Sequence, residues 1–190
     1  MIRRPPRSTL FPYTTPSDLS LSKATCTRAI NDLSASGLIS QTAEGTNKWI
    51  TTAYTKSELL EKAYGRLKTP VDRILYVKGT AQIEHPIASG IRALARQSMI
   101  GVNDQDGAIA ISKKEAAKIP AEDICTKQYF EDFGGAVIEV WSYDPIILER
   151  DGCVDDISLL LSMDNDPNER VQTCLDEIRQ KHGLPIKEEE

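Results

Sequence analysis

The sequence predicts an α+β fold, in which a helix, a hairpin and a second helix precede a small mixed sheet-and-helix domain. Two observations support this: helical periodicity with capping signals before residue 70, and short apolar runs beyond it. With 190 residues, 40% hydrophobic and 27% charged, the chain can bury a core and form one or two domains. We expect domains at 19–69 and 70–185, followed by an acidic tail at 186–190.

The distribution of charge also divides the chain. Residues 19–70 contain seven Lys or Arg against four Asp or Glu, a net charge of +3. Residues 71–190 contain thirteen against twenty-three, a net charge of −10. A polyanion is therefore expected to bind only residues 19–70. The acidic second domain is expected to serve dimerisation, to bind a protein partner or to sense an effector.

Other features bear on location and cofactors. The sequence has no run of eighteen apolar residues, and its start lacks the apolar core of a signal peptide, so we expect a cytoplasmic protein without a membrane partner. The four cysteines are far apart, and only two histidines accompany them. No metal site or cofactor site is predicted.

The segment from residue 19 to residue 40 carries the main functional signal. Ser22 is a good N-cap, and Gly37 supplies a residue that ends a helix. Between them, apolar residues recur at helical spacing and predict one buried helix face: Cys26, Ala29, Ile30 and Leu33. The opposite face carries short polar or cationic side chains that can contact phosphates or base edges, together with the cap: Ser22, Lys23, Thr25, Thr27, Arg28 and Asn31.

A hairpin is predicted directly after this helix. Extended segments at 38–42 and 48–52 flank the turn signal Glu44-Gly45-Thr46-Asn47. A polar helix, a glycine turn and a small hairpin follow one another in this order in a winged helix-turn-helix. A capped amphipathic helix followed by a hairpin also occurs in many other folds, so periodicity alone leaves this assignment open.

The residues of this segment resemble the MarR-type winged-helix regulators of bacteria. The resemblance rests on the run Ser-Lys-x-Thr-x-x-Arg, residues 22–28, and on Ser-Gly-Leu-Ile at 36–39. It implies that the helix from Ser22 to Leu33 enters the major groove of double-stranded DNA, with Lys48 on the wing near the backbone. The residues that would then read base edges or position the helix on the DNA are Thr25, Thr27, Arg28 and Asn31. The phosphates would be neutralised by Lys23 and Lys48.

The first eighteen residues do not fit this domain. A winged domain needs two helices before its recognition helix, and the residues before Ser22 contain no amphipathic segment that could supply them. Residues 1–15 resemble, without a mismatch, the translation of a widely used short-read sequencing adapter, and the loss of one base extends the match through residue 18. We therefore expect residues 1–18 to be a non-native, disordered segment and the winged domain to be N-terminally truncated. The expected partner, double-stranded DNA, is accordingly a partner of the untruncated protein.

A second helix and a mixed domain are predicted after the hairpin. Thr55 and Glu58 form a capping-box signal, and a helix follows them. Short apolar runs predict strands at 73–77, 108–112 and 136–141, with a helix at 88–100 and a weaker candidate at 112–119. The last helix is expected to begin after Asp166 as N-cap and to end at Gly183.

The second half also carries a looser resemblance. Its segments Gly90–Ala95, Trp141–Pro145 and Val154–Ser162 are similar to elements of bacterial proteins described as MarR-like regulators. A winged helix before a mixed domain is also similar to the AbiEi-type antitoxins of abortive-infection systems. In those, the DNA-binding half represses its own operon and the second domain helps to counter a nucleotidyltransferase toxin. An antitoxin is therefore the alternative function.

The third hypothesis is that the protein is an enzyme. Asp144, Asp155 and Asp156 could form a carboxylate cluster for metal or acid–base chemistry. Asp144-Pro145 is a turn signal, however, and the other two aspartates fit the first turn of a helix. Trp141 and Tyr143 could line a pocket, although a tryptophan that closes a strand belongs more often to a core. No catalytic residue is predicted, and we expect a protein that is not an enzyme.

Overall fold

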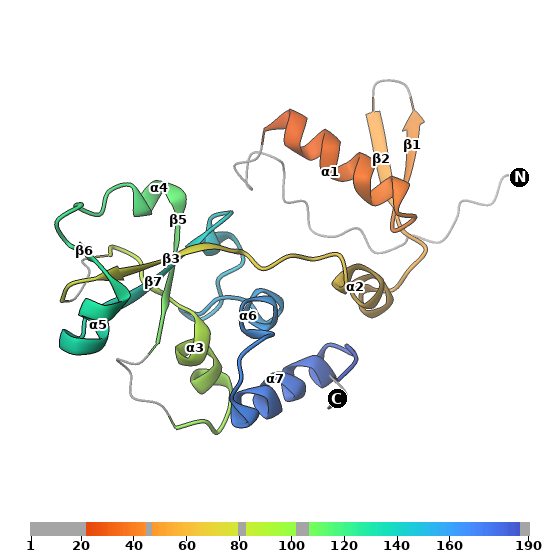
Figure 1. The fold of residues 1–190 in the computed structure, drawn as a ribbon. Coiled ribbons are helices and arrows are strands. Elements are labelled where there is room, and N and C mark those ends of the chain that lie inside the picture. The colour runs from red at the N-terminus through yellow and green to blue at the C-terminus, as the bar shows by residue number, and fades with distance from the viewer. Residues whose placement is uncertain (1–21, 45–46, 80–82, 102–106, 187–190) are drawn as a thin grey trace, which may run out of the picture. The chain divides into compact units, whose positions relative to one another are not determined.

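The computed structural model describes residues 22–44, 47–79, 83–101 and 107–186 (Figure 1). The expected adapter-derived segment 1–18 and most of the expected acidic tail lie outside these ranges. The chain divides into two compact units, Met1–Arg66 and Leu67–Glu190, and each is described by itself. Together they contain helices, a two-stranded sheet and a five-stranded mixed sheet, which confirms the predicted α+β class. No helix in the described ranges is both long and apolar enough to cross a bilayer.

The first unit consists of two helices around a hairpin. The order is α1 (Lys23–Ala35), β1 (Ser40–Glu44), β2 (Asn47–Thr51) and α2 (Lys56–Tyr64), with β1 and β2 antiparallel. Ser22 caps α1 as predicted, because its Oγ accepts the backbone N–H of Thr25 at 3.1 Å. The predicted capping box of α2 is also present, since the side chain of each partner bonds the backbone N–H of the other.

The prediction of a buried apolar face on α1 is wrong for the described chain. No residue of α1 is buried, and in its apolar stripe Cys26 and Ile30 are half-buried whereas Ala29 and Leu33 are exposed. The physical reason is that the described part of this unit offers no second layer over the whole stripe. In the described part of the first unit, one hydrophobic residue is buried, namely Leu38, three residues after the end of α1.

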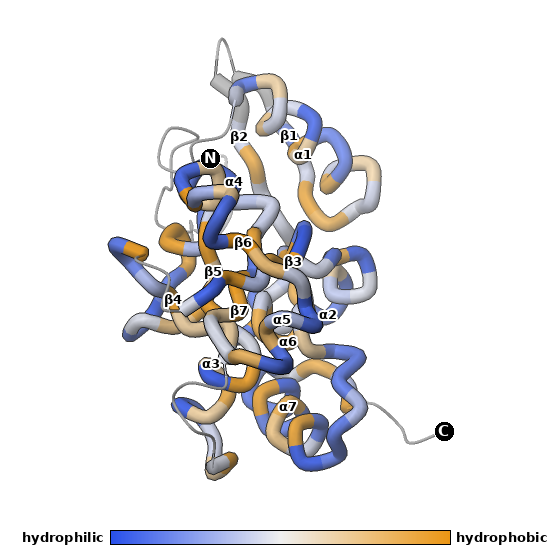
Figure 2. Tube along the Cα trace, turned by 60° about the vertical axis from the view of Figure 1, so that its left-hand side comes forward, coloured by the Kyte–Doolittle hydropathy of each residue, from blue (hydrophilic) through white to orange (hydrophobic). Residues whose placement is uncertain are grey.

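The second unit is built on a five-stranded sheet. Its strands are β3 (Val71–Val77), β4 (Ile87–Ala88), β5 (Ile109–Ser112), β6 (Ile124–Cys125) and β7 (Ala136–Trp141). They lie in the order β4-β5-β7-β3-β6, with β5 parallel to β7 and every other neighbouring pair antiparallel. The three predicted strands are the three central ones, and Figure 2 shows hydrophobic residues along β5 and β7.

The two faces of this sheet are covered unequally. Alternation along the strands places six aliphatic side chains on one face: Leu75, Val77, Ile109, Ile111, Ile138 and Val140. The short helix α4 (Lys113–Ala116) packs there, through the buried Ala116. The side chains of Glu139 and Trp141 point to the opposite face. There α3 (Gly90–Gln97), α6 (Asp156–Met163) and α7 (Glu169–Lys181) pack on one another (Figure 1).

Two features of the second unit differ from the sequence predictions. Asp166 does not cap the last helix: its Oδ1 accepts the backbone N–H of Asn168 at 2.9 Å, and Asn168 is the N-cap of α7. The aspartate therefore closes the turn that precedes the cap. Helix α5 (Lys127–Phe133), capped by Thr126, lies in a segment without a predicted element.

A polar contact joins the start of α6 to the end of α7. The Oδ2 atom of Asp156 lies 2.9 Å from Nζ of Lys181 and 2.7 Å from Nε2 of His182. Partial burial of Asp156 opposes its ionisation, yet the hydrogen bonds from His182 and Lys181 outweigh burial and hold the pKa of this carboxyl below its usual value. The charged carboxylate thus stabilises the packing of the two helices.

We expect Asp156→Asn to lower the free energy of unfolding by about 1 kcal/mol at neutral pH, because the amide loses the ion pair with Lys181 and weakens the hydrogen bond with His182. A depressed pKa in the folded state gives stability that is present above the unfolded pKa of about 3.9 and is lost as the pH falls through the folded value. The difference from wild type should therefore close below about pH 4. Urea unfolding followed by Trp141 fluorescence in a Trp49→Phe background measures it. Asp123→Asn, at an exposed aspartate, is the control; a difference that persists at low pH contradicts the assignment.

Candidate nucleic-acid interface

The exposed face of α1 gathers the predicted recognition residues. Lys23, Thr27 and Asn31 follow one another at intervals of four residues and therefore form one column along the helix. Arg28 lies beside this column, and all four residues are exposed. The first turn of α1 contains no acidic residue, so the partial positive charge of the helix N-terminus is not neutralised within it.

The hydroxyl groups at the start of α1 already bond within the helix. The side-chain oxygens of Ser22 and Thr25 lie 2.8 Å apart, and Ser22 Oγ also accepts the N–H of Thr25. Thr27 Oγ1 donates to the carbonyl oxygen of Lys23 at 2.9 Å. The hydroxyl of Thr27 can therefore still accept a hydrogen bond from a ligand, but its own proton is used.

The cations of this face are available for a polyanion. Within the described ranges, neither Lys23 nor Arg28 takes part in an ion pair. Both side chains can only donate, and the guanidinium of Arg28 presents five N–H groups in a fixed plane. Lys48 lies on β2, where its backbone is paired with Ala43, and its side chain is outside the described part of the structure.

The hairpin touches this face through Gln41, a residue that the sequence patterns did not single out. Its Nε2 donates to Oδ1 of Asn31 at 3.4 Å and to the carbonyl oxygen of Ile30 at 3.5 Å. The amide oxygen of Asn31 therefore accepts one hydrogen bond and keeps a second lone pair, and its Nδ2 can donate outward. No periodicity marks Gln41, because its contact depends on how β1 packs against α1.

In the second unit, a buried carboxylate joins the central strand of the sheet to the start of α3. Glu139, on the central strand β7, is only 9% exposed. Its Oε2 accepts a hydrogen bond of 2.5 Å from Ser89 Oγ, just before α3, and one of 3.0 Å from Trp141 Nε1. These donors compensate the cost of burying an acidic group in the sheet. The expectation that Trp141 belongs to the core is confirmed, since it is 1% exposed.

The same network reaches α6. The ring of Tyr143 packs edge-on against Trp141, with centroids 5.4 Å apart, and its hydroxyl shares a hydrogen bond of 2.5 Å with Ser158 Oγ. Burial raises the pKa of the Tyr143 phenol, the bond to Ser158 opposes this in part, and the nearby charge of Asp155 adds to it. The phenol therefore stays neutral and keeps its proton. The arrangement fixes α3, β7 and α6 to one another.

The three aspartates of the enzyme hypothesis each make a structural contact close to a helix end. Asp144 caps a short 3-10 helix at Pro145–Ile147, Asp155 caps α6, and Asp156 bonds the end of α7. Among the described residues, no three His, Cys, Asp or Glu side chains are grouped as metal ligands. The capping roles agree with the turn and helix-start patterns in the sequence.

Comparison of the chain with protein-family models, with curated proteins and with solved structures finds no match. The functional argument therefore depends on the residues and contacts described above.

We expect Ser89→Ala to lower the free energy of unfolding of the second unit by about 1–3 kcal/mol, because the buried Glu139 carboxylate loses one of its two donors. Urea unfolding followed by Trp141 fluorescence in the Trp49→Phe background measures this loss. Ser142→Ala removes an exposed hydroxyl on the same strand end and should change stability by less than about 0.5 kcal/mol. Equal effects of the two substitutions would show that the buried hydrogen bond contributes nothing.

Proposed function

We propose that the protein is a DNA-binding transcriptional regulator that inserts α1 into the major groove of double-stranded DNA. The observation that carries this proposal is the exposed face of α1. Lys23, Thr27, Arg28 and Asn31 share this face, and no acidic residue lies in the first turn. The hairpin β1–β2 follows α1 directly, as a wing follows a recognition helix.

The side chains of this face suit different parts of a duplex. Lys23 and Arg28 would neutralise or position phosphates, and Arg28 is also long enough to donate to guanine O6 and N7. Asn31 would donate through Nδ2 to an acceptor on a base edge. Ser22 and Thr25 form the cap of the helix, whose N-terminal N–H groups favour a phosphate. The hydroxyl of Thr27 would accept a hydrogen bond from the DNA, and Lys48 would contact the DNA backbone from the wing.

The charge distribution supports the same assignment. Residues 19–70 have a net charge of +3, whereas residues 71–190 have a net charge of −10. The second half would repel a duplex, so DNA would be met by the first unit. The second unit would then bind a protein partner, bind an effector or mediate self-association.

We expect Arg28→Ala to weaken the binding of the protein to duplex DNA about tenfold near 0.1 M salt, through loss of one phosphate contact, when the two helices that precede a recognition helix are restored in place of residues 1–18. The slope of log affinity against log salt concentration should fall in magnitude by about 0.9. Fluorescence anisotropy with labelled duplexes from a random pool measures both quantities. Arg66→Ala removes the same charge from an exposed position of the same unit outside α1 and is the matched control. Binding that is absent, or that does not depend on salt, contradicts the proposal, as does an equal loss in the control.

We expect Asn31→Ala to relax sequence preference at one or two base pairs without changing the salt slope, because the amide is neutral and would contact a base. Selection of duplexes from a random library by wild type and variant, followed by sequencing, measures the preference. Asn47→Ala, on the hairpin, offers a control with the same loss of an amide. An unchanged preference in Asn31→Ala would remove this residue from base readout.

The antitoxin alternative depends on the second unit. One observation favours a protein partner there: Tyr129 and Phe133 of α5 are both exposed, and their ring centroids lie 4.8 Å apart. Exposed aromatic side chains are typical anchors of protein interfaces. Under this alternative, Phe133→Ser would weaken a complex with the toxin while DNA binding through α1 remained unchanged.

A further inference from the structure

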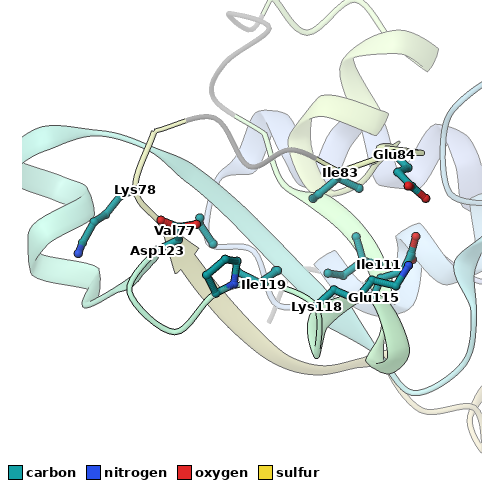
Figure 3. Close-up of a pocket in the computed structure, with 10 residues that line it drawn as sticks. Val77, Lys78, Ile83, Glu84, Ile111, Glu115, Lys118, Ile119 and Asp123 are labelled. Carbon is teal, nitrogen blue, oxygen red and sulfur yellow. The ribbon is translucent and has the colours of Figure 1, made fainter.

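A cavity opens on the sheet of the second unit, where β3 ends and where β5 passes into α4 (Figure 3). Its apolar floor is already covered, because Val77 and Ile111 are only 1% exposed. A ligand would therefore gain little apolar contact there. In the first unit, the contact between β1 and α1 is more specific, because it fixes which atoms of a helix side chain face outward.

One side chain of the hairpin bonds two successive residues of α1. Gln41 is half-buried on β1, and its Nε2 donates to the backbone carbonyl oxygen of Ile30 at 3.5 Å and to Oδ1 of Asn31 at 3.4 Å. The amide nitrogen carries two hydrogens, so both bonds can form at the same time. Gln41 therefore joins the strand to the helix at two neighbouring points.

The carbonyl group of Ile30 determines how both amide side chains are turned. A carbonyl oxygen can only accept, so Gln41 must present its amide nitrogen to α1 and not its amide oxygen. The same nitrogen faces Asn31, and a donor requires an acceptor there. Asn31 consequently turns Oδ1 toward Gln41. An asparagine without this contact could turn either its oxygen or its nitrogen toward the hairpin.

The remaining hydrogen-bonding groups of Asn31 match one base. Asn31 is exposed, its Oδ1 keeps a second lone pair, and its Nδ2 has no hydrogen-bond partner in the described part of the chain. In a planar amide this lone pair and one N–H lie along the same edge. In the major groove, adenine presents the complement of this edge, a donor at N6 and an acceptor at N7. Guanine presents two acceptors, O6 and N7, and cannot donate to Oδ1.

We propose that Gln41 positions Asn31 to bind adenine through N6 and N7, so that the hairpin contributes to the choice of one A·T base pair. This inference rests on the proposed insertion of α1 into the major groove. Gln41 acts through Asn31 and is a positioning residue. Because Asn31 is held before DNA binds, it loses less rotational freedom on binding. The freedom of one such side chain corresponds to about two- to tenfold in affinity.

The first test requires no DNA and uses the full chain labelled with ¹⁵N. Gln41→Met keeps the length of the side chain but removes the amide, so the NMR order parameter of the Asn31 Nδ2 group should fall. Thr42→Val is the matched control, because Thr42 is the exposed neighbour of Gln41 on β1 and its side chain lies on the other face of the hairpin. An order parameter that is unchanged in Gln41→Met, or that falls equally in both variants, overturns the inference independently of what the protein binds.

The second test measures base preference in the protein with the two helices restored in place of residues 1–18. At the base pair where Asn31→Ala loses preference, the protein without further substitution should favour A·T about tenfold. Gln41→Met should reduce this factor to about two or three, whereas Thr42→Val should retain it. In the Asn31→Ala background, Gln41→Met should have no further effect on the preference. Competition between duplexes that differ at this base pair, followed by fluorescence anisotropy, measures each factor.

The outcomes separate this inference from the proposed function. A preference for G·C at this base pair, or an undiminished preference in Gln41→Met, overturns the inference and leaves DNA binding by α1 in place. Equal weakening of all duplexes by Gln41→Met, with the preference unchanged, would show that Gln41 only supports the fold, and this also overturns the inference. If the protein without these substitutions binds no duplex, the proposed function is wrong and this inference with it.

Discussion

The buried carboxylate of Glu139 is the interaction on which the second unit depends. A carboxylate in the middle of a sheet is costly unless donors satisfy it, and Ser89 and Trp141 both donate to the same oxygen. Because Ser89 lies just before α3, this pair fixes the start of that helix against the central strand. Trp141 then packs on Tyr143, and Tyr143 bonds Ser158 of α6. The two helices and the strand therefore hold one another in a single geometry.

The two units differ in how they use polar side chains. In the second unit a few such groups are buried or paired, as Glu139, Arg179 and Asp156 are. In the described part of the first unit, the polar face of α1 is turned outward, and only Leu38 is buried among its hydrophobic residues. One unit thus has a specified core, whereas the other presents a surface with little core beneath it.

Capping residues in the sequence predicted where helices begin, whereas the features that the sequence patterns missed depend on contacts between residues far apart in the chain. Ser22 and Thr55 cap their helices as their sequence context indicates, since a cap depends on the next three residues. Asp155, expected in the first turn of a helix, is instead the N-cap of α6. Asp166 was misassigned because Asn168 competes for the same role. Strands β4 and β6 have two residues each, too few for a periodic signal, and exist only because β5 and β3 pair with them. Gln41, Glu139 and the lining of the cavity depend on pairs of residues far apart in sequence.

The position of β7 has a consequence for the newly made chain. It lies at the centre of the sheet, between β5 and β3, yet it is the last of the five strands along the chain. During synthesis β3 and β5 leave the ribosome without the neighbour that joins them, and each exposes aliphatic side chains until residues 136–141 emerge. The sheet can then close only late and across long loops, which makes its assembly slow. Chains that stop before β7 would carry unpaired strand edges and would be prone to aggregation or proteolysis.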